Sequence, residues 1–105
     1  MKDKIDSDIF SKINSEKNKI FSSLPRFTIM LILITNKKSK IIDLSKTLNF
    51  TSGNLDHHLK ILEENKMLKK NSQLFQNRFY ATVQITKNGM DSFTEYLELL
   101  KDVID

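Results

Sequence analysis

The sequence predicts a mostly α-helical domain with one small β-hairpin, and three observations support this prediction. Apolar residues recur every three or four positions through most of the 105 residues, which is the period of amphipathic helices. Between Met67 and Ile85 the period shortens to two, as in paired strands with one buried face. A chain of this length builds one hydrophobic core rather than two. The expected order is four helices, two strands and a final helix.

The first two helices are predicted from apolar spacing and from one proline. Ile5, Ile9 and Ile13 lie four residues apart, so residues from about 5 to 22 are expected to form one amphipathic helix. Pro25 suits the first turn of a second helix, where its missing N–H has no partner to lose. The segment RFTIMLILIT that follows is almost wholly apolar, which indicates a buried central helix. The charged segment NKKSK is expected to end it as a loop.

Residues 41–64 predict two helices joined by a tight turn. The apolar positions of the first helix follow helical spacing: Ile41, Leu44 and Leu48. Asn49 tolerates the left-handed backbone conformation, so it can end this helix abruptly, and Ser45 is small enough for two helices to approach closely. Thr51 or Ser52 then caps a helix over residues 52–64. Its apolar positions are again four and three residues apart: Leu55, Leu59 and Leu62.

A hairpin and a last helix complete the pattern. We predict a strand over residues 67–71, a polar connection over residues 72–78, and a second strand over residues 79–85 with one buried face. Thr86 caps a helix whose acidic residues lie opposite an apolar stripe. This order of elements is that of a winged helix-turn-helix, with the hairpin as the wing. The alternative, a generic helix pair in a small bundle, does not explain the period-two segment.

Charge is distributed unevenly over the three parts that we distinguish. These are an N-terminal helix (1–23), a winged helix-turn-helix domain (24–85) and a C-terminal helix (86–105). The net charge of the chain is +4, but the central part alone has ten Lys and Arg against four Asp and Glu. The C-terminal part has five acidic residues against two lysines. A basic excess around a helix-turn-helix favours a polyanionic partner.

Composition and motifs exclude several classes of function. The chain has no cysteine, which excludes disulfides, thiol catalysis and zinc sites made of cysteines. It has no nucleophile–base motif, Gly-rich phosphate loop or paired metal ligands, so we expect no enzyme, cofactor or metal site. The N-terminal segment lacks the apolar stretch of a signal peptide, and the longest apolar run, residues 29–34, is too short for a bilayer. We therefore expect a cytoplasmic, nucleoid-associated protein without a membrane partner.

Three segments resemble the compact ArsR/MarR-type winged helix-turn-helix transcriptional regulators of archaea and bacteria: SLPRFTIMLIL, IIDLSKTLNFTSGNLDHHLKILEENKML and YATVQITKNGMDSF. The similarity covers about residues 24–100. It implies that double-stranded DNA is the partner, with helix 52–64 in the major groove and wing 67–85 on the backbone or minor groove. Two positions depart from the family pattern. Asn65-Lys66 stands where members commonly have Gly, and Asp56 stands where many have Ser.

Six residues in and before the recognition helix are predicted to contact DNA: Thr51, Ser52, Gly53, Asn54, His57 and Lys60. The first two can cap the helix and touch phosphate, and Gly53 admits the backbone close to DNA. Asn54 can pair with an adenine edge. Capping alone would also explain the first three residues. His57 is expected to point outward together with Asn54 and Lys60.

The two adjacent histidines are predicted to have different roles. They point about 100° apart on a helix, so they cannot converge on one metal ion. His58 follows Leu55 by three positions and is expected to lie inside. Further DNA contacts are predicted for basic residues of the wing and its flanks: Lys69, Lys70, Arg78, Lys40 and Lys46. The alternative for the wing is a solvated hairpin whose lysines protect an edge strand.

The last helix has more apolar surface than one small domain can use, which predicts a homodimer. We place ten residues of the terminal helices at its interface: Ile5, Ile9, Ile13, Phe93, Tyr96, Leu97, Leu99, Leu100, Val103 and Ile104. Such a dimer would present two recognition helices to successive major grooves. A wide face buried within a monomer is the alternative for the last helix.

An effector of unidentified chemistry is a further candidate partner. The alternative function is a winged-helix protein-interaction module, a subunit of a larger complex without specific DNA readout.

Overall fold

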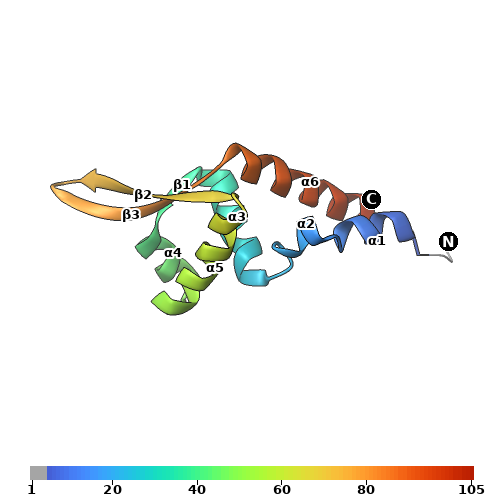
Figure 1. Cartoon of the computed structure of the whole chain (residues 1–105), viewed down its shortest axis with the longest axis horizontal. Helices are drawn as coiled ribbons and strands as arrows, with labels where there is room; N and C mark the ends of the chain where they lie inside the picture. Colours follow the sequence, from blue (N-terminus) through green and yellow to red (C-terminus); the bar gives the residue numbers. More distant parts are fainter. Residues whose placement is uncertain (1–4) are drawn as a thin grey trace.

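The computed structural model describes residues 5–105, which form helices and strands around one core. In chain order these are α1 (Ser7–Ile13), α2 (Glu16–Lys19), α3 (Leu24–Asn36), β1 (Lys38–Lys40), α4 (Ile41–Leu48), α5 (Ser52–Glu64), β2 (Leu68–Phe75), β3 (Arg78–Ile85) and α6 (Lys87–Ile104). Hairpin β2–β3 projects from one end of the molecule, and α1 and α6 extend toward the other (Figure 1). Helices α3, α4 and α5 lie between them. The predicted winged helix-turn-helix is confirmed.

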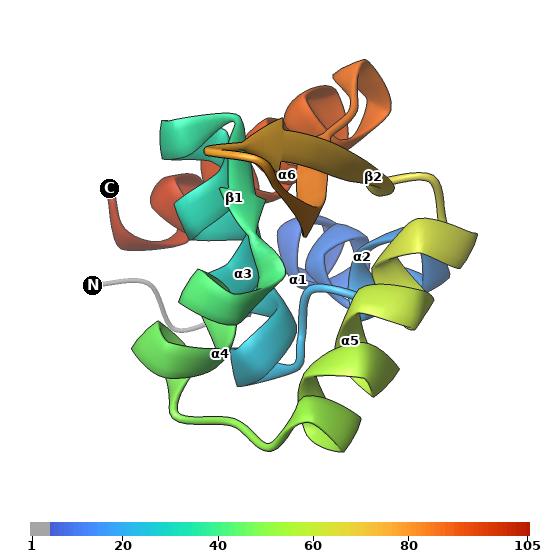
Figure 2. The ribbon, with the colours of Figure 1, turned by 90° about the vertical axis from the view of Figure 1, so that its left-hand side faces the viewer.

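The helix-turn-helix forms as its local sequence predicts. Asn49 ends α4 in the left-handed conformation, with φ 53° and ψ 44°. Across the turn, the Ser45 hydroxyl donates a hydrogen bond of 3.0 Å to the carbonyl oxygen of Phe50. Leu44 and Leu55 are both buried in the shared core, and Leu48 and Phe50 pack against it. Figure 2 shows α4 and α5 joined by this turn, beside the sheet.

The sheet is larger than predicted. Its order is β1-β3-β2 with antiparallel pairing throughout. The prediction of a polar connection over residues 72–78 is wrong, because Gln76 and Asn77 alone turn the chain, with φ 50° and 64°. Such a two-residue turn lets both strands continue to its edge. The prediction that NKKSK is only a loop is also wrong, since Lys38–Lys40 pairs with residues 82–84 of β3.

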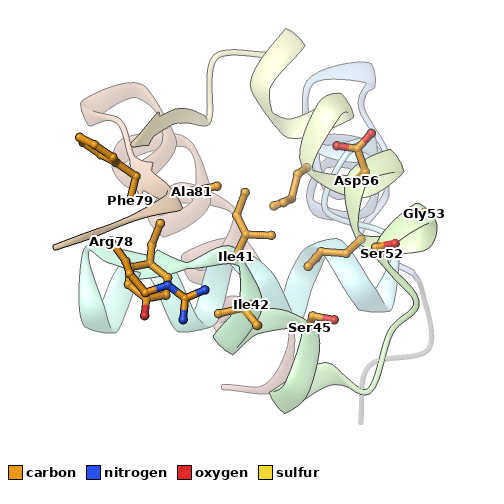
Figure 3. Close-up of a pocket in the computed structure, with 12 residues that line it drawn as sticks. Ile41, Ile42, Ser45, Ser52, Gly53, Asp56, Arg78, Phe79 and Ala81 are labelled. Atoms are coloured by element: carbon orange, nitrogen blue, oxygen red, sulfur yellow. The ribbon is translucent and has the colours of Figure 1, made fainter. Parts of the chain in front are cut away.

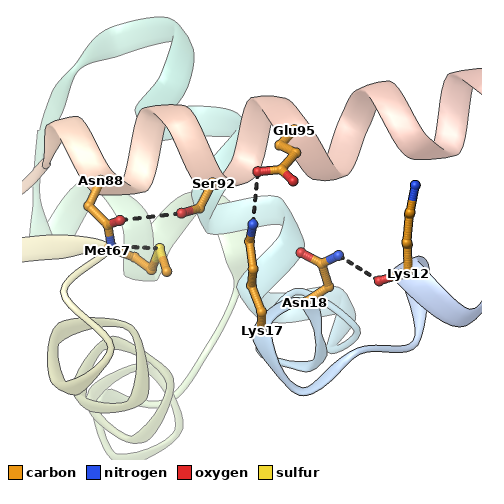
Figure 4. A network of polar contacts seen from close by, with 7 residues as sticks. All are labelled: Lys12, Lys17, Asn18, Met67, Asn88, Ser92 and Glu95. Carbon is orange, nitrogen blue, oxygen red and sulfur yellow. Dashed lines mark hydrogen bonds and ion pairs between the residues drawn. The ribbon is translucent and has the colours of Figure 1, made fainter.

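The N-terminal segment folds as two short helices, which corrects the single helix predicted over residues 5–22. Asn14 ends α1, and Ser15 begins α2 from an extended conformation. Asn and Ser favour such ends because their side chains compete for backbone hydrogen bonds. The buried Asn18 side chain donates to the carbonyl oxygen of Lys12 at 2.9 Å, and Lys17 pairs with Glu95 of α6 at 2.9 Å (Figure 4). The predicted segment 1–23 also includes residues 1–4, which lie outside the described residues.

Helix α6 buries two residues that we had predicted at a dimer interface. Phe93 is fully buried and Tyr96 is 8% exposed within a single chain. The ring of Phe21 packs against both of them, with centroid distances of 5.2 and 5.3 Å. Their assignment to a dimer interface is therefore wrong, because the chain's own aromatic residues already cover them. Apolar surface remains exposed nearer the chain ends, at Ile5, Val103 and Ile104.

Candidate nucleic-acid interface

The first turn of α5 is exposed and capped. The Thr51 side chain accepts a hydrogen bond of 3.2 Å from the backbone N–H of Asn54, so the predicted N-cap is confirmed. Ser52, Gly53 and Asn54 are all exposed, and apart from adjacent residues and the backbone of α5 itself, no atom lies within 4 Å of a side-chain carbon built on Gly53. The backbone of α5 is therefore open to close approach at its N-terminus, where the helix dipole favours an anion.

The outward face of α5 continues from Asn54 through His57 to Lys60, and all three residues are exposed. Positions three apart on a helix lie on one side, so these side chains form a single row. His58 is half-buried, as predicted, and its ring lies 6.1 Å from the ring of Phe50 between centroids. The helical phase expected for the two histidines is confirmed.

Burial and a contact from Arg26 favour the neutral form of His58 by lowering its pKa. The guanidinium Nη1 lies 3.0 Å from Nδ1 of His58, and Nε donates to the carbonyl oxygen of Ile20 at 2.8 Å. Because a guanidinium only donates, Nδ1 of His58 accepts and the ring proton sits on Nε2. Burial lowers the pKa of His58, and the charges of Arg26 and His57 lower it further. Arg26 thus links the recognition helix to α3 and to the end of α2.

The stability contributed by neutral His58 should be lost in acid. An unfolded histidine has a pKa of about 6.5, and the folded pKa is lower, so the unfolded chain takes up the proton first as the pH falls. Between about pH 7 and pH 5, we expect the urea midpoint to fall more for the wild type than for His58→Asn, whose amide oxygen accepts from Arg26 without titrating. His57→Asn, at an exposed position, is the control: it removes only the last and smallest of the three causes that lower the pKa of His58, so most of the wild-type acid sensitivity should remain. Equal acid sensitivity of wild type and His58→Asn would contradict this assignment.

The structure holds two of the predicted DNA-contacting lysines in internal contacts. Lys70 pairs with Asp56 of α5 at 3.3 Å, so the acidic residue on the recognition helix is compensated by the wing. Lys40 lies over the rings of Phe75 and Tyr80, 4.5 and 4.1 Å from their centroids. Neither contact was predicted from the sequence, because each joins elements that are distant along the chain.

The remaining predicted cations do not share one face. Lys46, Lys69 and Arg78 are exposed. Neighbouring residues of a strand point to opposite faces, so Lys69 faces away from α5 whereas Lys70 faces it. Arg78 stands at the start of β3, next to the turn of the wing. The guanidinium carbon lies 5.6 Å from the ring centroid of Tyr80.

A groove of about 750 Å³ separates the recognition helix from the wing. It is lined by α4, by the first half of α5 and by the outer part of β3 (Figure 3). Two of its lining residues, Ile42 and Phe79, are large, apolar and exposed, and we had predicted neither as a site residue. Phe79 begins the apolar alternation of strand 79–85, for which we had predicted one buried face. Phe79 is exposed because both strands extend beyond the core. Predicting the two-residue turn at Gln76-Asn77 would have given this longer hairpin.

Among residues 5–105, no group of three or more His, Asp or Glu could hold a metal ion. No helix within these residues is long and apolar enough to cross a membrane.

The fold, the exposed first turn of α5 and the adjacent wing together define a winged helix-turn-helix protein. The winged helix DNA-binding domain family matches residues 25–104, and the chain belongs to this family. This is a family of DNA-binding domains rather than of enzymes. The resemblance to ArsR/MarR-type winged helix-turn-helix regulators is confirmed.

Known proteins similar to this chain include one relative in sequence and several solved structures. The uncharacterized protein MJ0432 of Methanocaldococcus jannaschii is 34% identical over 79 residues, which cover 75% of this chain and 86% of that protein. The transcriptional regulator homologue protein from Pyrococcus horikoshii OT3 has a TM-score of 0.84 at 32% identity, over 93% of this chain and 95% of that chain. Reduced AbfR bound to DNA has a TM-score of 0.68 at 22% identity, over 91% of this chain and 67% of that chain, which is a likeness in fold.

Proposed function

We propose that this protein is a transcriptional regulator that binds specific sequences of double-stranded DNA as a homodimer. Helix α5, residues 52–64, enters the major groove, and the wing, residues 67–85, lies on the backbone and minor groove. One observation carries this proposal: the first turn of α5 is capped, exposed and unobstructed around Gly53. The structures of AbfR bound to DNA, which share this fold, support it further.

Each exposed residue of α5 has a role that follows from its chemistry. The helix N-terminus at Thr51 and Ser52 faces a phosphate. Asn54 can donate to and accept from an adenine edge, and His57 and Lys60 extend this contact along the groove. Arg78 at the wing enters the minor groove, and Lys46 on α4 contacts the backbone. Lys40 and Lys70 instead orient the wing through their internal contacts.

The homodimer is proposed from the apolar surface near the chain ends. Ile5 is 76% exposed and Ile104 is 83% exposed, and Val103 and Leu99 lie on the same helix as Ile104. Exposed apolar clusters of this kind mark protein interfaces. The half-buried residues Ile9, Ile13, Leu97 and Leu100 would form the inner edge of that interface. We place the predicted effector between the two protomers.

The variant Gly53→Ala tests the proposal in a single experiment with the wild type. We expect wild-type affinity for a duplex to fall about a hundred-fold between about 50 and 200 mM salt, if about four phosphates are neutralised. Gly53→Ala should bind about ten-fold more weakly, because its methyl group occupies the space that the backbone of DNA needs. The same change should leave the urea midpoint unchanged or raise the stability by up to about 1 kcal/mol, since alanine favours the helix and no neighbour is displaced.

Fluorescence anisotropy with a labelled duplex measures the affinity, and urea unfolding measures the stability. Thr94→Ala, at an exposed position of α6, is the matched control, since it also replaces a weaker helix former and should not alter DNA binding. Absent or salt-independent binding would favour the alternative function, a protein-interaction module. Undiminished binding by Gly53→Ala would show that α5 does not approach DNA through its first turn.

A further inference from the structure

The outer half of the wing carries large apolar side chains that the core does not cover. Phe79 is 75% exposed, Leu74 is 56% exposed and Phe75 is 50% exposed. All three lie within three residues of the turn, on the part of the hairpin that projects beyond the helices (Figure 1). Solvent-exposed strands usually carry polar residues, so an apolar cluster here indicates a surface that is covered in use.

The strand register divides this cluster between two faces. Leu74 pairs with Phe79 across the hairpin, and Lys70 pairs with Val83 four residues closer to the core. Side chains two or four positions apart point to the same side of a strand, so Leu74 and Phe79 share a face with Lys70. Because Lys70 is bound to Asp56 of α5, this face is turned toward the recognition helix. Leu74 and Phe79 therefore form what we name the wing patch.

The opposite face of the hairpin is occupied by an internal contact. Phe75 and Tyr80 both lie against the ammonium group of Lys40 from β1. This cation–π contact explains why Phe75 is on the surface without requiring a partner. The wing patch has no such explanation. Across the groove from Phe79 lie α4 and residues 52–59 of α5, the same elements that face DNA in the proposed function.

Charge identifies the occupant of the wing patch. Residues 68–85 contain no Asp or Glu, and Arg78, beside Phe79 at the turn, pairs with Phe75 and extends the basic surface to the other side of the hairpin. A second copy of the chain is a poor occupant, because a symmetric contact would bring together two basic hairpins, neither of which has an acidic residue to offset the charge. Duplex DNA offers both surfaces that are needed: phosphates for Arg78, and the apolar C–H edges of deoxyribose for Leu74 and Phe79.

We propose that the wing patch packs against deoxyribose rings at the rim of the minor groove, while Arg78 contacts the adjacent phosphates or the groove itself. This inference rests on the proposed function and adds an apolar component to DNA binding by the wing. The DNA strand between the major and minor grooves would then lie in the groove lined by Ile42, Ser52 and Phe79. Apolar side chains are known to enter minor grooves in other DNA-binding folds.

The test compares two phenylalanines that flank the same turn. Phe79→Ala should weaken binding to a duplex about ten-fold, because it removes an apolar contact, and it should leave the salt slope unchanged, because no counterion is involved. Phe75→Ala, on the opposite face, leaves the closer contact of Lys40 with Tyr80 in place, so it should change the affinity by no more than about two-fold. Arg78→Ala should reduce the slope of log affinity against log salt by about one unit. Melting curves should be unchanged for Phe79→Ala, since its side chain is mostly exposed.

Hydroxyl-radical cleavage of a duplex selected from a random pool gives a second, direct readout. These radicals attack deoxyribose hydrogens in the minor groove, so the wild type should protect sugars beside the recognition site, and Phe79→Ala should lose that protection. If the wild type and Arg78→Ala behave as expected but Phe79→Ala binds and protects like the wild type, the inference is wrong and the proposed function stands. A change of oligomeric state in Phe79→Ala would also overturn the inference, since the patch would then be a protein interface. If the wild type does not bind DNA, the proposed function itself fails.

Discussion

Replacing Gly89 with alanine should destabilise the domain by about 3 kcal/mol or more, at the upper end of what overpacking costs. A side-chain carbon on Gly89 would lie 2.0 Å from the carbonyl oxygen of Met67 and 2.9 Å from its carbonyl carbon. Both are backbone atoms, so no rotation of a side chain can relieve the contact. Helix α6 packs its first turn directly on the chain entering the wing, and only glycine allows this distance.

The backbone around Met67 has little freedom to move away. Its N–H donates to the carbonyl oxygen of Leu62 at 2.9 Å, and its own carbonyl oxygen accepts from Thr86 at 3.1 Å. The Thr86 hydroxyl also donates to the carbonyl oxygen of Lys66 at 2.7 Å. A shift of Met67 would break bonds that join the end of α5, the start of β2 and the cap of α6. The cost should therefore extend to all three elements.

Thermal unfolding measures the effect of Gly89→Ala. At about 4–8 °C per kcal/mol for a domain of this size, the midpoint should fall by more than about 12 °C. Gly53→Ala is the matched control, because it makes the same chemical change in the first turn of a helix with open space around it. A Gly89→Ala protein that melts with the wild type would mean that α6 and the wing entry are packed less closely than the structure shows.

Local signals in the sequence were sufficient for the helix-turn-helix. Helix α5 begins and ends at the predicted residues, because Thr51 is a good N-cap and Leu55, Leu59 and Leu62 follow one helical phase. Asn49 supplied the turn because its side chain tolerates a left-handed backbone. These features depend on residues within one or two helical turns of each other, so a single sequence contains them.

Features that depend on distant residues were missed. Strand β1 exists because β3, more than forty residues later, pairs with it. The contacts of Lys40 with the wing and of Lys70 with Asp56 likewise join separate elements, so two predicted phosphate ligands make contacts within the chain that the sequence did not indicate. The backbone at Lys66, by contrast, is local in origin: the N–H groups of Lys66 and Met67 donate to the carbonyl oxygens of Glu63 and Leu62 and close the end of α5. Lys66 adopts φ 62°, a conformation that favours the glycine commonly found there in the family, and its carbonyl oxygen accepts from Thr86.

Changing Val103 to glutamate should convert the proposed dimer into monomers and weaken binding to a two-site duplex by about a hundred-fold. Val103 is 44% exposed and lies in the last turn of α6, beside the exposed Ile104. A charge buried at a symmetric interface appears twice, once from each protomer, and neither copy would have a partner. A monomer then binds each half-site alone and loses the gain that linked sites provide, which is typically about 10²–10⁴.

Sedimentation and DNA binding must change together in Val103→Glu for this explanation to hold. The matched control is Thr94→Glu, which adds the same charge at an exposed polar position of α6 and should leave both the dimer and the affinity intact. The protomer of Val103→Glu should remain folded, and its melting temperature should fall only by what loss of the dimer costs, because Val103 lies outside the core around Phe93 and Tyr96. Tyr96 is unsuitable for this test, because a charge there would unfold the protomer before it separated the dimer.

A wild type that sediments as a monomer at about 10⁻⁵ M would exclude a dimer of useful affinity. The exposed apolar ends of α1 and α6 would then need a different partner.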